Sequence, residues 1–338
     1  MRYVSINNLI IKKFTKLTLL IIIIMNQFLM VFKNKYNEMK YKNYINVAYA
    51  FDKNYHYITH VSMKSIMLSQ KKETFINFFM LVSNITDEQR TVINKISEEH
   101  KNCKIFFFDL GNHFKEFKIT TNIWSTADFY RLKLVELLKG YKKVLYLDTD
   151  TLVYKDLTTI YNNDISGKYF IGMPEPKGKE WFINNSISFN NFINTGVLLC
   201  NLEELQKDNI LDKITEYIRN NINNLKYPVN DPTNLISYKK NGIFNPEFVV
   251  VGFCNEEDAF NYYNYYKIKI NKTLVVEAYK DPYVLHYINY IKPWRGISNK
   301  NGLVCYDSIS RFYEAARKTS YFYDIMKRFP VTIKHLRL

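Results

Sequence analysis

"LYLDTDTLV", residues Leu145–Val153, is an apolar run interrupted by two aspartates, and the fold assignment starts from it. The apolar residues predict a buried strand, where a carboxylate costs free energy unless something pairs with it. The partner of Asp148 and Asp150 could be a metal ion, a basic side chain or water at the end of the strand. Side chains two residues apart in an extended chain point to the same side, so both carboxylates can face one point. That geometry suits a divalent cation. In the alternative, one aspartate caps the next turn and the other faces solvent.

Predicted strands and helices alternate before this stretch. The strands are apolar along most of their length and cover Ile45–Asp52, Thr74–Ser83, Cys103–Leu110 and the run that ends at Asp148. Between them the spacing predicts helices at His60–Leu68, after the N-cap candidate Thr86, and from Ser125 or Thr126 to Gly140. This alternation predicts an α/β fold with a mostly parallel sheet covered by helices on both faces. Ligands of such sheets bind outside the carboxyl ends of the strands, where the two aspartates stand.

The composition narrows the class of protein. The chain has 338 residues, 47% hydrophobic and 23% charged, which excludes a disordered charged polymer. Its formal net charge of +15 indicates an anionic partner: nucleic acid, a membrane surface or a phosphorylated small molecule. A nucleic-acid-binding protein would need a recognisable binding module, and the sequence contains none. The four cysteines are far apart, without zinc or redox spacing, so a reducing cytosol is expected.

The first 40 residues form a segment of their own. Leu17–Met25 is continuously apolar and Phe28–Phe32 nearly so, and basic residues precede both. The run is shorter than the roughly 20 residues of a spanning helix. It is interpreted as a weak membrane anchor, or as untranslated sequence ahead of a start at Met25 or Met39.

Four stretches, in order, resemble glycosyltransferase family 8. The longest is ADFYRLKLVELLKGYKKVLYLDTDTLV, which is similar to the family's central motif. The others are VAYAFDKNY (Val47–Tyr55), FINTGVLLCNL (Phe192–Leu202) and HYINYIKPW (His286–Trp294). The resemblance implies a GT-A type nucleotide-sugar-binding fold in a catalytic domain of residues 41–300. It also implies an Asp-x-Asp motif that holds a manganese ion against UDP.

The resemblance assigns roles to individual residues. Asp148, Asp150 and His286 would hold Mn²⁺, with Mg²⁺ as a substitute, and Lys292 would reach the diphosphate. Arg131 would reach the donor sugar, although a surface helix arginine is the alternative. Asn194 would bond sugar hydroxyls, its alternative being a plain turn residue. The remaining donor-binding residues by resemblance are Ala48, Tyr49, Asp52, Asn54 and Thr149. Tyr49 would stack on uracil or be one more core aromatic.

Two positions depart from the family pattern. Asn289 stands where glycine is usual, and Pro232 stands where a glutamine lies under the reacting sugar carbon in relatives. Family members retain the anomeric configuration. Without a certain carboxylate under that carbon, we expect front-face attack assisted by the leaving phosphate, with Asp231 as the fallback nucleophile.

The expected function is therefore a retaining hexosyltransferase. It would move glucose or galactose from UDP-glucose or UDP-galactose to a saccharide acceptor, in lipopolysaccharide or another surface glycan or glycolipid. A metal-dependent sugar nucleotidyltransferase is the alternative enzyme, but it usually has a glycine-rich phosphate loop, and VAYAFDKNY has no glycine. A nucleic-acid-binding protein is the less favoured alternative.

Residues 301–338 form a predicted basic, aromatic and helical C-terminal tail. Such a tail suits an anionic membrane surface, which predicts a cytoplasmic enzyme peripheral on the inner face of the cytoplasmic membrane. The alternative is a helix packed on the domain with a solvated basic face.

Overall fold

The computed structural model describes residues 41–117, 125–175, 191–251, 256–265, 271–288, 292–295 and 306–330. The expected N-terminal anchor, residues 1–40, lies outside them. Within these ranges no helix has both the length and the apolar character to cross a membrane.

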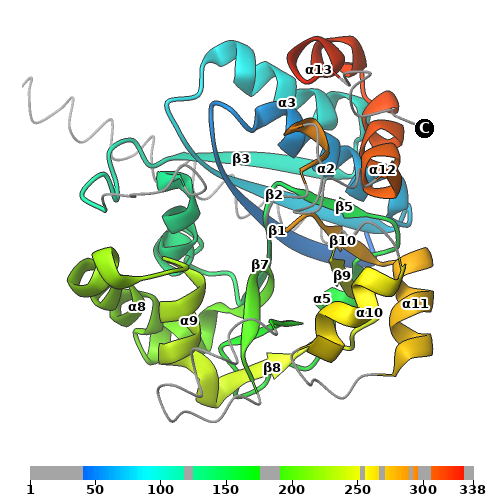
Figure 1. Cartoon of the computed structure of the whole chain (residues 1–338). Helices are drawn as coiled ribbons and strands as arrows, with labels where there is room; N and C mark the ends of the chain where they lie inside the picture. Colours follow the sequence, from blue (N-terminus) through cyan, green and yellow to red (C-terminus); the bar gives the residue numbers. More distant parts are fainter. Residues whose placement is uncertain are drawn as a thin grey trace, which may run out of the picture.

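A seven-stranded sheet organises the chain (Figure 1), with the strand order β3-β2-β1-β4-β7-β6-β8. These strands are β1 (Asn43–Asp52), β2 (Thr74–Ser83), β3 (Cys103–Asp109), β4 (Lys143–Leu147), β6 (Phe170–Pro174), β7 (Ile193–Asn201) and β8 (Asn241–Ile243). β1 runs parallel to β2 and β4, β2 to β3, and β6 to β8, whereas β7 is antiparallel to both of its neighbours. The mostly parallel sheet expected from the sequence is confirmed.

Helices cover both faces, as predicted. Alternate residues of β1 enter different cores: Val47 and Tyr49 pack with α2 (His56–Ser69) and α3 (Asp87–Glu99), and Ala48 packs on the other face. That other face is covered by α4 (Leu134–Leu137), α7 (Leu202–Lys207) and α8 (Ile210–Asn221). Thr86 caps α3 as predicted, because its side chain accepts a hydrogen bond from the Gln89 amide.

The predicted helix from Ser125 to Gly140 is wrong in its type and its end. A 3₁₀ helix, η1 (Thr126–Lys133), precedes the single turn of α4, which ends at Leu137. In η1 the Asp128 carbonyl accepts a hydrogen bond from Arg131 Nε at 2.9 Å. This side-chain contact accompanies the tighter helical register and keeps Arg131 turned toward β4.

A second, three-stranded sheet continues the opening motif. β5 (Thr151–Val153) resumes directly after the aspartates, and β10 (Val284–His286) lies between it and β9 (Val249–Val251). β10 is antiparallel to β5, which pairs His286 with Thr151. His286, which is 135 positions after Thr151 in the chain, thus arrives beside Asp150.

The C-terminal helices are part of the main body. α12 (Tyr306–Arg317) and α13 (Phe322–Arg328) lie beside α2 and α3 in Figure 1. Phe312, Ala316 and Ile325 are buried in the same core as β1 and α2. Residues 306–330 of the expected tail include these two helices, and their apolar face closes this core. The alternative, a helix packed on the domain, is the observed one.

The remaining elements connect these layers. They are α5 (Thr158–Tyr161), η2 (Ile222–Asn224), α9 (Asn230–Ser237), η3 (Tyr238–Lys240), α10 (Glu256–Tyr265), α11 (Lys272–Lys280) and η4 (Pro293–Arg295).

Candidate active site

Two aspartates and a histidine converge beyond the carboxyl end of β4. Asp148 follows β4, Asp150 precedes β5, and His286 ends β10. One ligand atom from each of the three lies within 4.8 Å of the others. His286 Nε2 is 3.7 Å from Asp148 Oδ2 and 3.2 Å from Asp150 Oδ1. The structure thus brings together the three predicted metal ligands, and the alternative of a solvent-facing aspartate fails for Asp150, which is buried.

The donor atoms of this group fit a divalent cation. Among the described residues, Asp150 Oδ1 is buried and makes no hydrogen bond, although His286 Nε2 lies 3.2 Å away. A buried carboxylate oxygen without a hydrogen bond is costly, and a cation between it and the imidazole would remove that cost. Two carboxylates and one imidazole form a mixed oxygen and nitrogen set that suits Mn²⁺.

A glycine on β7 makes room for this group. The backbone of Gly196 accepts a hydrogen bond from the Asp148 amide at 2.7 Å. A Cβ atom at position 196 would lie 2.1 Å from His286 Cε1 and 2.5 Å from Asp148 Oδ2. Only glycine fits there without displacing a ligand. Sequence reasoning gave this residue no role, and its single signal was its position two residues after Asn194.

Arg131 holds the first aspartate. Its guanidinium donates to Asp148 Oδ1 at 2.8 Å and to the Thr195 carbonyl at 2.5 Å, and it lies 4.3 Å from the centre of the Tyr146 ring. Arg131 is 7% exposed, so the alternative of a surface helix arginine is wrong. Its expected contact with the donor sugar stays a prediction.

Lys292 holds the second aspartate. Its ammonium contacts Asp150 Oδ2 and the Tyr287 carbonyl. Burial opposes ionisation of Asp150, but the Lys292 ammonium and His286 hold the pKa of that carboxyl below its usual range. Trp294, two residues on, is buried and packs 5.1 Å from the Phe312 ring of α12, between ring centres.

A second polar cluster lies where β6 ends and β7 begins. Asn194 donates from Nδ2 to Glu175 Oε2 and accepts at Oδ1 from the Gly196 amide, both at 2.8 Å. Asn194 belongs to β7, so it is not the plain turn residue of the alternative. Glu175 is buried, and sequence reasoning missed it because no motif marked it.

Asp231 lies at the start of α9 and is 3% exposed. It accepts a hydrogen bond from the Tyr227 amide at 3.0 Å, and burial raises its pKa to about 6. Pro232 follows it inside the helix, while Asn230, just before it, accepts from the Thr195 amide at 3.1 Å. The start of α9 is thereby tied to β7 beside the Arg131 contact.

The residues expected to contact uridine separate into two groups. Ala48 and Tyr49 are completely buried, and the Tyr49 hydroxyl pairs with Ser62 Oγ at 2.8 Å. The expected stacking of Tyr49 on uracil is therefore wrong, because the ring faces the core helix α2. Asp52, at the end of β1, stays partly exposed and accepts from the Asn54 amide at 2.8 Å. Thr149 is buried between the two aspartates, and Asn289 lies outside the described residues.

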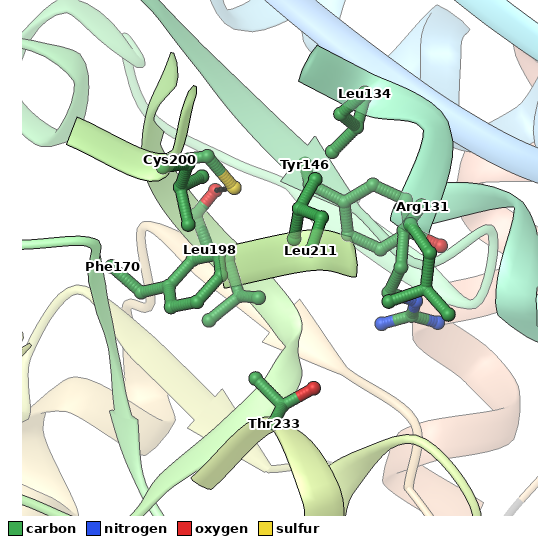
Figure 2. Close-up of a pocket in the computed structure, with 10 residues that line it drawn as sticks. Arg131, Leu134, Tyr146, Phe170, Leu198, Cys200, Leu211 and Thr233 are labelled. Atoms are coloured by element: carbon green, nitrogen blue, oxygen red, sulfur yellow. Dashed lines mark hydrogen bonds between the residues drawn. The ribbon is translucent and has the colours of Figure 1, made fainter. Parts of the chain in front are cut away.

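A narrow apolar pocket lies behind Arg131 (Figure 2). Figure 2 shows Arg131 beside Tyr146, with Phe170, Leu198 and Cys200 across from them. Its lining is almost entirely apolar, so it offers a diphosphate few hydrogen-bonding groups.

Comparisons with known proteins agree with this geometry. Residues 46–298 match the family model "Glycosyl transferase family 8". The chain is 29% identical over 209 residues to a protein of Haemophilus influenzae called "Putative glycosyltransferase", spanning 60% of this chain and 62% of that protein. It is 23% identical over 263 residues to an Escherichia coli lipopolysaccharide 1,2-glucosyltransferase, spanning 75% of this chain and 74% of the relative.

The fold is similar to that of the galactosyltransferase LgtC, solved in complex with donor and acceptor sugar analogues. The TM-score is 0.67 at 22% identity, over 82% of this chain and 96% of that one. At this identity the likeness concerns the fold alone.

Proposed function

Because the chain belongs to glycosyltransferase family 8 and has its GT-A type fold, we propose that it transfers a hexose from a UDP-sugar to a saccharide acceptor. The observation that carries the proposal is the convergence of Asp148, Asp150 and His286 within 4.8 Å beyond β4. These residues would hold Mn²⁺, or Mg²⁺ in its place. The bound ion would stabilise, as a Lewis acid, the charge that develops on the departing diphosphate.

Residues of the chain would bind the donor and stabilise the charge on its diphosphate. Lys292 would place an ammonium at the diphosphate, where negative charge grows as the bond to the sugar breaks. Asp52 and Asn54, at the end of β1, would contact the uridine, and Thr149 would line the same edge. Arg131 would orient Asp148 through its fixed guanidinium. Asn194 would bond sugar hydroxyls from the start of β7.

The donor is UDP-glucose or UDP-galactose. The names of two relatives, a lipopolysaccharide 1,2-glucosyltransferase and a lipopolysaccharide 1,3-galactosyltransferase, support these two sugars. The transfer retains the anomeric configuration by front-face reaction. The bond from the anomeric carbon to phosphate breaks, the acceptor oxygen attacks from the same face, and its proton passes to the leaving phosphate oxygen. Asp231 is the fallback nucleophile; its amide contact and its burial in α9 favour the front-face route.

The acceptor is a glycan such as lipopolysaccharide, as the name of the Escherichia coli relative suggests. The enzyme would work at the inner face of the cytoplasmic membrane. Support comes from the exposed basic side chains of α12, α13 and the turn between them, which are Arg317, Lys318, Lys327 and Arg328, with the exposed Tyr323 among them. Phe312, Tyr313 and Phe322 of these helices are partly or fully buried and add little to such a contact.

The test is metal-dependent release of UDP. Wild-type protein should hydrolyse UDP-glucose or UDP-galactose slowly in Mn²⁺, more than UDP-N-acetylglucosamine, and chelation should abolish the reaction. Asp150→Asn should lower the rate by about 100-fold or more. Asp164→Asn, at an exposed carboxylate, is the matched control and should behave as wild type. Equal hydrolysis without metal, or an unaffected Asp150→Asn variant, would contradict the proposed function.

A further inference from the structure

Each carboxylate of the candidate metal group already carries a cation of the chain. Asp148 uses Oδ1 for Arg131, at 2.8 Å, and Asp150 uses Oδ2 for Lys292. The opposite oxygens, Asp148 Oδ2 and Asp150 Oδ1, are the ones that lie near His286 Nε2. Both carboxylates are therefore paired with positive side chains before a ligand arrives, and Asp128 Oδ1, 3.9 Å from the Arg131 guanidinium, is a third carboxylate beside the group.

The two cations are attached very differently. Arg131 donates to Asp148, to the Thr195 carbonyl and to the Asp128 carbonyl, and its planar group lies over Tyr146. Lys292 contacts only Asp150 and the Tyr287 carbonyl among the described residues. A guanidinium held at three points is fixed, whereas an ammonium on a flexible four-carbon stem can change partners. Lys292 is thus the exchangeable cation of the pair.

We propose that the Lys292 ammonium leaves Asp150 for the diphosphate of the donor, and that this exchange couples metal binding to nucleotide binding. The inference rests on the proposed function. A dication that enters a group whose two ligand carboxylates are already paired with cations leaves an excess of positive charge near a partly buried site. A diphosphate offsets that excess and gives Lys292 a new partner. Metal alone and nucleotide alone should each bind weakly, and each should strengthen the other by the same factor.

The experiment measures the affinity for Mn²⁺ from the electron paramagnetic resonance signal of the free ion, with and without UDP. In wild type, saturating UDP should raise the Mn²⁺ affinity about tenfold or more. Lys292→Met keeps the apolar stem and removes the charge. It should bind Mn²⁺ alone about tenfold more tightly than wild type, and UDP should then add much less. Lys292→Arg keeps the charge and should bind Mn²⁺ alone as weakly as wild type.

Arg295→Met is the matched control. It removes one positive charge from the same short segment, but Arg295 donates to the Tyr55 hydroxyl at 2.9 Å and has no carboxylate partner in the described part of the chain. Its Mn²⁺ affinity should equal that of wild type. If Lys292→Met binds Mn²⁺ alone no more tightly than wild type, or if Arg295→Met gains as much, the exchange is refuted.

A further variant separates this inference from the proposed function. Asp150→Asn should lose Mn²⁺ binding with and without UDP. If wild type binds Mn²⁺ and UDP cooperatively and loses both in Asp150→Asn, while Lys292→Met changes nothing, the exchange alone fails. If wild type binds neither Mn²⁺ nor UDP, the proposed function fails, and the exchange fails with it.

Discussion

Asp148 and Asp150 are two residues apart in the chain, yet different regions of the molecule hold them. The region around Asp148, here the sheet side, consists of η1, β4, β7 and the start of α9. The region around Asp150, here the C-terminal side, consists of β10, η4, α12 and α13. Hydrogen bonds join the sheet side: Arg131 donates to the Thr195 carbonyl, the Gly196 carbonyl accepts from the Asp148 amide, and Asn230 accepts from the Thr195 amide. The C-terminal side depends on packed aromatic rings, with Trp294 against Tyr287 and Phe312.

Because of this difference, the side chains around Asp148 are fixed, whereas the Lys292 ammonium beside Asp150 can move. Directional hydrogen bonds to the backbone of a central strand leave Arg131 and Asp148 one arrangement. Aromatic packing supports η4, the turn that contains Trp294 and directly follows Lys292, but leaves the Lys292 ammonium free to turn on its stem. The site thus combines a fixed half, which positions the ligand oxygens, with a half whose charge can follow the substrate.

Phe312→Ala should have the largest effect, by breaking the C-terminal side. The ring is 1% exposed, so its removal should lower the free energy of unfolding by about 3–5 kcal/mol. Urea denaturation measures this. Tyr323→Ala, at a ring that is 86% exposed, should change it by less than about 0.5 kcal/mol. A small effect at Phe312 would mean that α12 is not part of the core.

The pH dependence of stability should reveal how the C-terminal side is attached. His60 of α2 is buried, and its ring lies 5.2 Å from Tyr321, at the start of α13, between ring centres. Burial, partly opposed by the Val92 backbone, lowers its pKa from 6.5 to about 4. Glu99 raises that pKa slightly, whereas Lys64 and His56 lower it.

Between these two pKa values the unfolded chain binds a proton at His60 and the folded protein does not. The free energy of unfolding should therefore fall as pH decreases from about 6.5 to about 4, by about 3 kcal/mol in total, and level off below. His60→Phe should remove this part of the dependence in urea titrations across that range. His113→Gln, at an exposed histidine, should keep it. The same dependence in His60→Phe as in wild type would exclude this residue as its source.

Gly196→Ala should disrupt the arrangement of His286 and Asp148 from the sheet side. The new methyl group would occupy space 2.1 Å from His286 Cε1, so the imidazole must move away from the carboxylates. We expect about 100-fold weaker Mn²⁺ binding in the presence of UDP. Calorimetry measures this, with Cys200→Ala, a small change on the same strand, as control. Unchanged affinity would show that His286 is not a ligand.

Arg131→Lys should sharpen the contrast between the two cations. The lysine keeps the charge but cannot bond Asp148 and two backbone carbonyls together. Asp148 loses its fixed orientation, so Mn²⁺ affinity should fall about tenfold, opposite in direction to Lys292→Met. If the Mn²⁺ affinity rose in both Arg131→Lys and Lys292→Met, the two cations would not differ in the way proposed.

The smallest effects should come from the exposed basic residues of the C-terminal side. Lys318→Gln and Lys327→Gln should each weaken binding to phosphatidylserine vesicles about fivefold, because each charge contributes separately to attraction by the anionic surface. Co-sedimentation at fixed salt measures this. Lys139→Gln, exposed after α4, removes the same charge elsewhere. If Lys139→Gln weakened vesicle binding as much, the net charge of the protein, and not the position of the two lysines, would explain the effect.

The sequence by itself determined what depends on neighbours along the chain. The continuous apolar runs, the Thr86 cap and the spacing of Asp148 and Asp150 are local patterns. The apolar runs predicted strands, Thr86 predicted the start of a helix, and the spacing predicted that the two carboxylates face one point. The order of four motifs was sufficient for the family, because each motif is a short contiguous stretch.

Only the tertiary structure decided which distant groups meet. It buried Tyr49 against α2 and closed the core with Phe312. It placed Gly196 where a Cβ would touch His286, and it set Glu175 beside Asn194. It also paired Arg131 with Asp148 and Lys292 with Asp150. The contact of Lys292 with Asp150 joins residues 142 positions apart. The energies of such contacts depend on strand order and packing, which no local pattern encodes.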